Sequence, residues 1–164
     1  MKTAQEWFDA YGVSHQNKTN KAIHWVCVPV IFFTTIGLFM SIPAGPLDLL
    51  PDSLAVYRNW GTVLLLVGMA FYATMGATIF LGMLGIAAVT FWGNAELASC
   101  LEMPLWQFSA IGFAVAWVGQ FIGHEIEGVK PSFFEDLQFL LVGPAWLLHF
   151  IYRKLGIPYC GRTA

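Results

Sequence analysis

Long stretches without charge constrain the fold of this chain more than any other feature. No Asp, Glu, Lys or Arg occurs in residues 22–47, 59–95 or 103–124. A membrane-spanning helix needs about 20 consecutive apolar residues, and each stretch is at least that long. Charged residues make up 11% of the 164 residues, against about a quarter in soluble domains. The sequence therefore predicts a single all-α membrane domain over residues 1–164.

The uncharged residues are expected to form four spans. The first runs from Lys21 to Ile42 and has Asn20 as its N-cap. The stretch from Trp60 to Trp92 is too long for one span, so we expect it to break near Met75-Gly76-Ala77 into two short helices. The fourth span is expected from Pro104 to Gly123.

Both ends of the chain are expected to lie outside the hydrocarbon layer. Residues 1–16 predict an interfacial helix, with Trp7, Phe8 and Tyr11 on one side at headgroup level. The apolar segment from Phe139 to Tyr152 is short for a span and predicts a re-entrant or interfacial helix. The expected architecture is an integral membrane helical bundle of about four transmembrane helices with one short helix at each end.

The distribution of basic residues predicts the orientation. With four spans, one side of the membrane holds seven of the eight basic residues, namely Lys2, Lys18, Lys21, Lys130, Arg153, Lys154 and Arg162. If the last segment also spanned, the split would be four to four, which is why it is assigned as non-spanning. Because cytoplasmic loops are enriched in Lys and Arg, both termini are predicted to be cytoplasmic. The membrane would be the inner membrane of a prokaryote or the endoplasmic reticulum of a eukaryote.

Composition and missing motifs narrow the function. A net charge of −2 and a pI near 6.0 give no basic patch, so nucleic acid is not an expected partner. The three cysteines have no CxxC spacing and predict no disulfide framework. The sequence has no nucleophile elbow, phosphate loop or dinucleotide fingerprint.

Histidines are the strongest candidates for chemistry. His15, His24 and His124 fall near the cytoplasmic ends of their segments, and His149 lies in the non-spanning piece. Ionisable groups in membrane segments are costly to bury and are functional candidates, here for binding a metal. On one continuous helix His15 and His24 would face opposite sides, so they share an ion only if the chain bends at residues 17–20.

A carboxylate accompanies the last of these histidines. Glu127 follows His124 by three residues, so the two are neighbours if the helix continues that far. Glu127 can ligate a metal, orient His124 or simply face water. Imidazoles with a carboxylate are the ligands of non-haem iron oxygenases, and zinc and copper are bound by the same groups. The ligand types alone therefore leave the metal open.

Two segments carry a resemblance to a known family. Tyr11 to Pro29 reads YGVSHQNKTNKAIHWVCVP, and Trp117 to Pro131 reads WVGQFIGHEIEGVKP, followed by Asp136 and Gly143-Pro144. Both segments resemble motifs of the membrane-embedded 2-hydroxy fatty acid dioxygenases, and they occur in the same order with spans between them. The fungal member of that family acts in phytosphingosine breakdown at the endoplasmic reticulum.

The resemblance implies an activity and a set of metal ligands. The implied reaction is Fe²⁺-dependent α-oxidation, in which a long-chain 2-hydroxy fatty acid and O₂ give the fatty acid one carbon shorter. The implied iron ligands are His15, His24 and His124, with His149 as a neighbour and not a ligand. An acyl chain would enter sideways from the membrane lipid, leaving its polar head at the cytoplasmic interface.

Polar residues of the two motifs complete the expected site. The catalytic candidates are Glu127, Asn17 and Asn20, and the substrate-binding candidates are Gln120, Lys21 and Lys130. The amides would hydrogen-bond the head group or the metal ligands, and the lysines would attract the carboxylate. The oligomeric state is left open.

Two other classes of function compete with the dioxygenase. A non-catalytic membrane scaffold or small-molecule carrier would use the histidines structurally and bind no stoichiometric metal. A zinc or di-metal membrane enzyme would keep the metal and change the reaction. Di-metal desaturases usually have clustered HxxxH spacings, which this sequence lacks.

Overall fold

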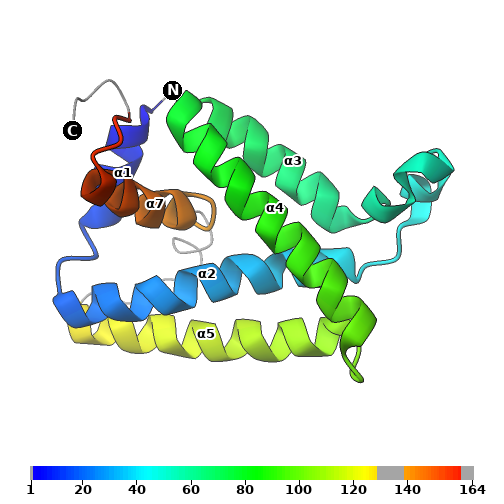
Figure 1. The fold of residues 1–164 in the computed structure, drawn as a ribbon. Coiled ribbons are helices and arrows are strands. Elements are labelled where there is room, and N and C mark those ends of the chain that lie inside the picture. The colour runs from blue at the N-terminus through cyan, green and yellow to red at the C-terminus, as the bar shows by residue number, and fades with distance from the viewer. Residues whose placement is uncertain (1, 129–138, 160–164) are drawn as a thin grey trace.

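The computed structural model describes residues 2–128 and 139–159, and within them every element is a helix (Figure 1). In chain order these are α1 (Ala4–Gly12), α2 (Lys18–Met40), the 3-10 helices η1 (Gly45–Leu49) and η2 (Asp52–Tyr57), α3 (Trp60–Ala73), α4 (Ala77–Cys100), α5 (Leu105–Glu127) and α7 (Val142–Leu155). The predicted all-α class is confirmed for these residues.

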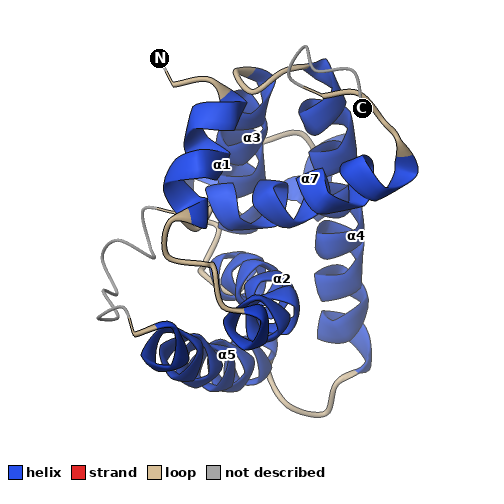
Figure 2. Ribbon diagram, turned by 90° about the vertical axis from the view of Figure 1, so that its left-hand side faces the viewer, coloured by secondary structure: helices blue, strands red, loops and turns tan. Residues whose placement is uncertain are grey.

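The helices form two pairs and a cap. α2 and α5 lie antiparallel along their length, and α3 and α4 form a hairpin that crosses them (Figure 1). α1 and α7 lie together over the end of the molecule where α2 begins and α5 ends (Figures 1 and 2). Segments from the start, the middle and the end of the chain therefore meet at that end.

In the part of the chain that the structure describes, three helices, and not the expected four, are long and apolar enough to cross a membrane. They are α2, α4 and α5, with 23, 24 and 23 residues. The uncharged stretch does break near Met75, as predicted, but it divides unequally. α3 begins at Trp60, where Asn59 caps it by accepting from the Thr62 N–H at 2.8 Å, whereas α4 continues past Trp92 to Cys100. With 14 residues, α3 rises about 21 Å, short of a hydrocarbon core about 30 Å thick.

A glycine makes the tight turn between α3 and α4. Gly76 has φ +111°, a backbone conformation that L side chains rarely adopt. This turn lets the two helices run back along each other and confirms the expected break. The last helix, α7, has 14 residues and is not among the helices long enough to span, which agrees with its prediction as a short non-spanning helix.

The start of α2 differs from the prediction by three residues. Asn17, and not Asn20, is the N-cap, and its Oδ1 accepts from the Thr19 N–H at 2.8 Å. Asn20 lies inside the helix and is fully buried. The local pattern favours either asparagine as a cap, and the packing of α5 against Asn20 decides between them.

The aromatic side of α1 packs against protein. Phe8 and Tyr11 are 3% and 6% exposed, so they do not lie at lipid headgroups as expected. The Phe8 ring stacks on His149 of α7 at 4.9 Å between centroids, and Tyr11 meets Trp146 edge-on at 5.1 Å. Thr3 and Glu6 form a capping box that starts this helix.

Two tyrosine hydroxyls fasten α7 to the hairpin. Tyr72 of α3 donates to the Leu141 carbonyl at 2.8 Å, and Tyr152 of α7 donates to the Thr78 carbonyl at 2.9 Å. Together with Ile79 and Met83, both fully buried, these residues belong to an apolar core shared by α1, α3, α4 and α7. α7 is thus held firmly beside the end of the α2–α5 pair.

Glycines on α5 allow it to approach α2 closely. A Cβ added at Gly119 would lie 2.6 Å from the Cys27 sulfur, and one at Gly123 would lie 2.4 Å from the Asn20 Oδ1. Small residues at such positions are typical of packed membrane helices. This close approach brings the side chains at the start of α2 against those at the end of α5.

Candidate metal centre

Three histidines from three segments converge at the end of the α2–α5 pair. His15 lies in the loop after α1, His24 on the second turn of α2 and His124 on the last turn of α5. They are 1%, 0% and 3% exposed, and one nitrogen of each lies within 4.8 Å of the others. The bend expected between His15 and His24 is present, over residues 13–17. The arrangement is a cluster of three nitrogen ligands able to share one ion.

Backbone carbonyls orient two of the three rings. The Nδ1 of His15 lies 2.7 Å from the Tyr11 carbonyl oxygen, and the Nδ1 of His24 lies 2.9 Å from the Asn20 carbonyl oxygen. Because a carbonyl only accepts, each Nδ1 carries the hydrogen and donates it. In the neutral form of a ring held this way the lone pair is on Nε2, which is the form that binds a metal.

Aromatic rings support the histidine from the loop. His15 stacks on Tyr11 at 4.2 Å between centroids with an interplanar angle of 15°, and Trp146 of α7 lies 5.4 Å away. The centroids of His24 and His124 lie 4.2 Å and 5.4 Å from that of His15. α1 and α7 therefore fix His15 against the two histidines of the paired helices.

Glu127 holds the loop that carries His15. Its Oε1 accepts from the Gln16 N–H at 2.7 Å, and its Oε2 accepts from the Asn17 N–H and the Asn20 side-chain amide, each at 2.9 Å. The cluster of potential metal ligands found in the described residues contains the three histidines and not Glu127. The carboxylate connects the end of α5 to the start of α2.

The amides of the predicted site take different positions. Asn20 also donates to the Ser14 carbonyl at 3.2 Å, so it joins the loop, α2 and Glu127. Asn17 caps α2. Gln120, 6% exposed, lines a small cavity of about 20 Å³ together with Tyr11 and Trp117. Lys130 lies outside the described residues.

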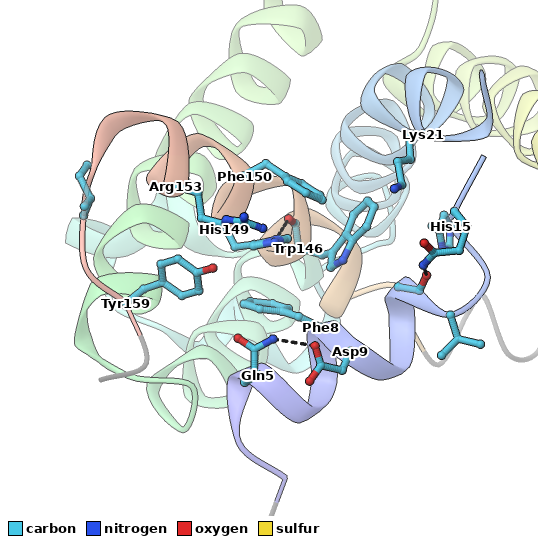
Figure 3. A pocket seen from close by; sticks show the side chains of 14 residues that line it. Gln5, Phe8, Asp9, His15, Lys21, Trp146, His149, Phe150, Arg153 and Tyr159 are labelled. Carbon is cyan, nitrogen blue, oxygen red and sulfur yellow. Dashed lines mark hydrogen bonds between the residues drawn. The ribbon is translucent and has the colours of Figure 1, made fainter. Parts of the chain in front are cut away.

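A larger cavity, the head-group pocket, opens beside His15. Its volume is about 690 Å³, and it lies between α1, α7 and the start of α2 (Figure 3). Its wall carries two positive charges, on Lys21 and Arg153, and one negative charge, on Asp9, and His149 lies on the α7 side (Figure 3). His15 is the member of the histidine cluster that lines this pocket.

His149 is buried but stands apart from the cluster. Its Nδ1 hydrogen-bonds the Trp146 carbonyl, its ring stacks on Phe8, and burial lowers its pKa below the ordinary value. Lys21 was expected near the substrate, whereas Trp146 and Arg153 were not singled out from the sequence. The one sequence feature that could have indicated Arg153 is its position as a cation in the last turn of a helix. Its place in the pocket wall depends on the packing of α7 on α1.

Comparison with known proteins identifies the family. A family model described as 2-hydroxy-palmitic acid dioxygenase Mpo1-like matches residues 1–155. No curated protein and no solved structure matches the chain. The matched range contains all three clustered histidines and the three helices that line the head-group pocket. The chain belongs to the 2-hydroxy-palmitic acid dioxygenase Mpo1-like family.

Proposed function

We propose that this protein is a membrane-embedded Fe²⁺-dependent dioxygenase that shortens 2-hydroxy fatty acids by one carbon. The observation that carries the proposal is the convergence of His15, His24 and His124, buried and within 4.8 Å of one another. The description of the family supports the substrate class and the use of O₂. The atoms balance without a further reductant: a 2-hydroxy acid and O₂ give the shorter acid, carbon dioxide and water.

The three histidines fit a divalent transition metal. Neutral imidazole nitrogens suit iron, zinc and copper, and bonds of about 2.0–2.1 Å allow two ligand nitrogens on one ion to lie up to about 4.2 Å apart. The nitrogens lie within 4.8 Å of one another, so the rings would turn toward the ion on binding it. Bound iron would supply the one-electron chemistry that O₂ requires.

The protein's own residues position the substrate in this proposal. Lys21 and Arg153 attract the carboxylate into the head-group pocket, where His15 forms part of the wall. Trp146 and Phe150 cover the pocket on the α7 side and exclude water from the first carbons of the chain. The head group thus reaches the histidine cluster from the side of α1 and α7.

Glu127 and Asn20 act as positioning residues in this proposal. Glu127 accepts hydrogen bonds from the backbone of the loop that carries His15, and Asn20 presents its carbonyl to His24. Both contacts set the direction in which a histidine nitrogen points. Gln120 and Lys130 remain candidates for substrate binding.

The proposed location is a membrane, with the histidine cluster near the cytoplasmic surface and both termini cytoplasmic. Three helices of sufficient length and hydropathy support a membrane location. All three histidines lie at the same end of the α2–α5 pair, so none has to sit at the centre of the bilayer. The orientation itself rests on the distribution of basic residues.

A zinc enzyme is the second candidate, because three histidines with an open position are also the ligands of catalytic zinc. Elemental analysis of protein purified without added metal in detergent, under anaerobic conditions, separates the two. We expect about one iron per chain in the wild type and a loss of that iron in His124→Ala. Iron-loaded protein should then convert 2-hydroxyhexadecanoic acid and O₂ to the C15 acid.

His149→Ala is the matched control for the metal measurement. It removes a buried histidine of the same cavity that lies outside the cluster, so iron should be retained. Stoichiometric zinc in place of iron would favour the second candidate. A wild type that holds neither metal and takes up no Fe²⁺ would leave the scaffold or carrier as the better account.

A further inference from the structure

A second cavity, the apolar groove, lies on the opposite side of α7 from the head-group pocket. Its volume is about 530 Å³, and α2, α4 and α7 form its walls. Its lining includes Trp25 and Pro29 of α2, Gly85 of α4, and Leu147 and Ile151 of α7. The volume falls in the range of about 300–1,000 Å³ typical of ligand pockets.

One row of side chains on α2 joins the two cavities. Lys21, Trp25 and Pro29 are spaced four residues apart, so they lie on one face of the helix. Lys21 lines the head-group pocket, whereas Trp25 and Pro29 line the groove. The face of α2 therefore changes from charged to apolar as it passes from one cavity to the other.

α7 forms the wall between the cavities. Phe150 lines the head-group pocket, whereas Leu147 and Ile151, four residues apart, line the groove. The rings of Trp25 and Phe150 lie 6.4 Å apart between centroids and are tilted by 45°. One ring of this aromatic pair lines the head-group pocket and the other lines the apolar groove, so the two cavities meet at the pair.

A glycine keeps the groove open on the α4 side. A Cβ at Gly82 would meet the Tyr152 hydroxyl and Leu148, so that part of α4 is packed against α7. A Cβ at Gly85, one turn further on, would have no atom within 4 Å. A side chain added at Gly85 would therefore extend into the groove without displacing protein.

From these features we infer that the apolar groove binds the acyl chain of the 2-hydroxy fatty acid whose carboxylate occupies the head-group pocket. This inference rests on the proposed function, because it takes the substrate class from there. A long-chain acid needs a cationic site and an apolar site joined end to end, and Lys21, Trp25 and Pro29 provide that sequence on one helix face. Each buried methylene tightens binding by about fourfold, so the groove sets the preferred chain length.

Photocrosslinking tests where the chain lies. The probe is 2-hydroxyhexadecanoic acid with a diazirine near the end of the chain, bound to metal-free protein in nanodiscs. We expect labelling of the α4 segment around Gly85 and of the groove side of α7. Labelling confined to the head-group pocket, or spread over the outer face of α5, would overturn the inference. Equal labelling by a phospholipid with the same diazirine chain would also overturn it, since the groove would then be an ordinary lipid contact.

A substitution in the groove tests the effect on chain length. Gly85→Phe should weaken binding of the C16 acid at least tenfold and leave a C8 2-hydroxy acid unaffected, and Gly85→Leu should act in the same direction but less. Ala88→Phe is the matched control, because Ala88 is exposed on the same helix and lies outside the groove. Equal affinities for the C16 acid in Gly85→Phe and Ala88→Phe, both of them folded by gel filtration, would refute the groove.

Failure of this inference and failure of the proposed function give different results. Crosslinking and binding are measured without metal or turnover, so an inactive or iron-free wild type counts against the dioxygenase alone. Turnover of 2-hydroxy acids by a wild type whose labelling avoids the groove counts against the groove alone.

Discussion

Two buried polar clusters lie near opposite ends of α2, and they are built for different tasks. The first contains His15, His24 and His124 near the start of the helix. The second contains Asn94 of α4 and Ser109 of α5, both fully buried, around Gly37 of α2. About 20 Å of helix separates His24 from Gly37. Each cluster joins three segments of the chain. At the first, α2 turns the polar side chains of Asn20 and His24 inward, and at the second it has a glycine, Gly37.

The chemistry of the two clusters differs in what remains available to a ligand. In the second cluster the Asn94 amide donates to the Phe33 carbonyl at 3.1 Å and the Thr90 carbonyl at 2.9 Å, so it ties α4 to α2. In the first, carbonyls hold Nδ1 of His15 and His24 and direct the opposite nitrogens toward one another. Polar side chains that hydrogen-bond the backbone of another helix hold two helices together. Histidine nitrogens that converge can instead bind a cation.

The largest expected effect comes from exchanging one side chain in each cluster. His24→Ala should lower Fe²⁺ affinity by more than about 100-fold, beyond the ~10–100-fold loss expected for a partner that does not touch the metal. Asn94→Ala should keep the metal but lose two hydrogen bonds, costing about 1–3 kcal/mol of stability. Anaerobic metal titration and thermal unfolding in detergent measure both quantities.

The same two variants can also contradict the difference between the two clusters. If Asn94→Ala loses iron as completely as His24→Ala, metal binding reports only the integrity of the fold. If His24→Ala retains full affinity for Fe²⁺, the histidine cluster has only a structural role, like the cluster around Gly37.

A second pair introduces one methyl group beside each cluster. Gly123→Ala would place Cβ 2.4 Å from the Asn20 Oδ1, and Gly37→Ala would place it 2.3 Å from the Ser109 Oγ. Each should cost about 1–3 kcal/mol through overpacking. Only Gly123→Ala should also weaken Fe²⁺ binding, since Asn20 holds His24 and the His15 loop. Stability and affinity measured on the same samples test this, and equal losses of affinity would contradict it.

Glu127→Gln is expected to have a smaller, site-specific effect. The amide oxygen can accept only part of the three contacts to residues 16, 17 and 20, so the His15 loop loosens. We expect Fe²⁺ affinity to fall about tenfold, with little change in unfolding temperature. Glu125→Gln is the control, because Glu125 is exposed and lies two residues before Glu127 on the same helix. A loss of equal size in both variants would point to net charge and not to the loop.

The smallest effect concerns the histidine that belongs to neither cluster. Burial lowers the pKa of His149, so the folded protein binds fewer protons there than the unfolded chain. The free energy of unfolding is therefore not reduced by His149 above the ordinary pKa near 6.5, and it decreases as the pH falls below that value. His149→Phe should remove this part of the decline while leaving the metal bound. Unfolding temperatures between pH 5 and 8 test it, and parallel curves for both proteins would contradict it.

Much of the fold follows from the sequence because uncharged runs and helix breakers act locally. The break at Met75-Gly76-Ala77 and the short last helix were predicted from such signals. The full extent of α4 was not, since this helix continues past the expected end at Trp92, through the charged Glu96, to Cys100. The choice of Asn17 over Asn20 as the cap of α2 depends on α5, which lies about a hundred residues away in the sequence.

The convergence of His15, His24 and His124 was predictable from the sequence, whereas the residues that surround them were less so. The spacing of His15 and His24 required a bend, and the polar loop between the helices supplies it. The bend lies at residues 13–17, slightly earlier than expected, because α2 begins at Lys18. Arg153 and Trp146 enter only through the packing of α7 on α1, a long-range contact without a local signal.

The contribution of α1 to the histidine cluster has a consequence for how the protein is made. His15 leaves the ribosome well before Trp146, yet its ring is held by Tyr11 and by Trp146. The cluster is therefore complete only after α5 and α7 have been synthesised and α7 has packed against α1. A chain that stops short of Trp146 carries all three histidines and still lacks the wall that holds them together.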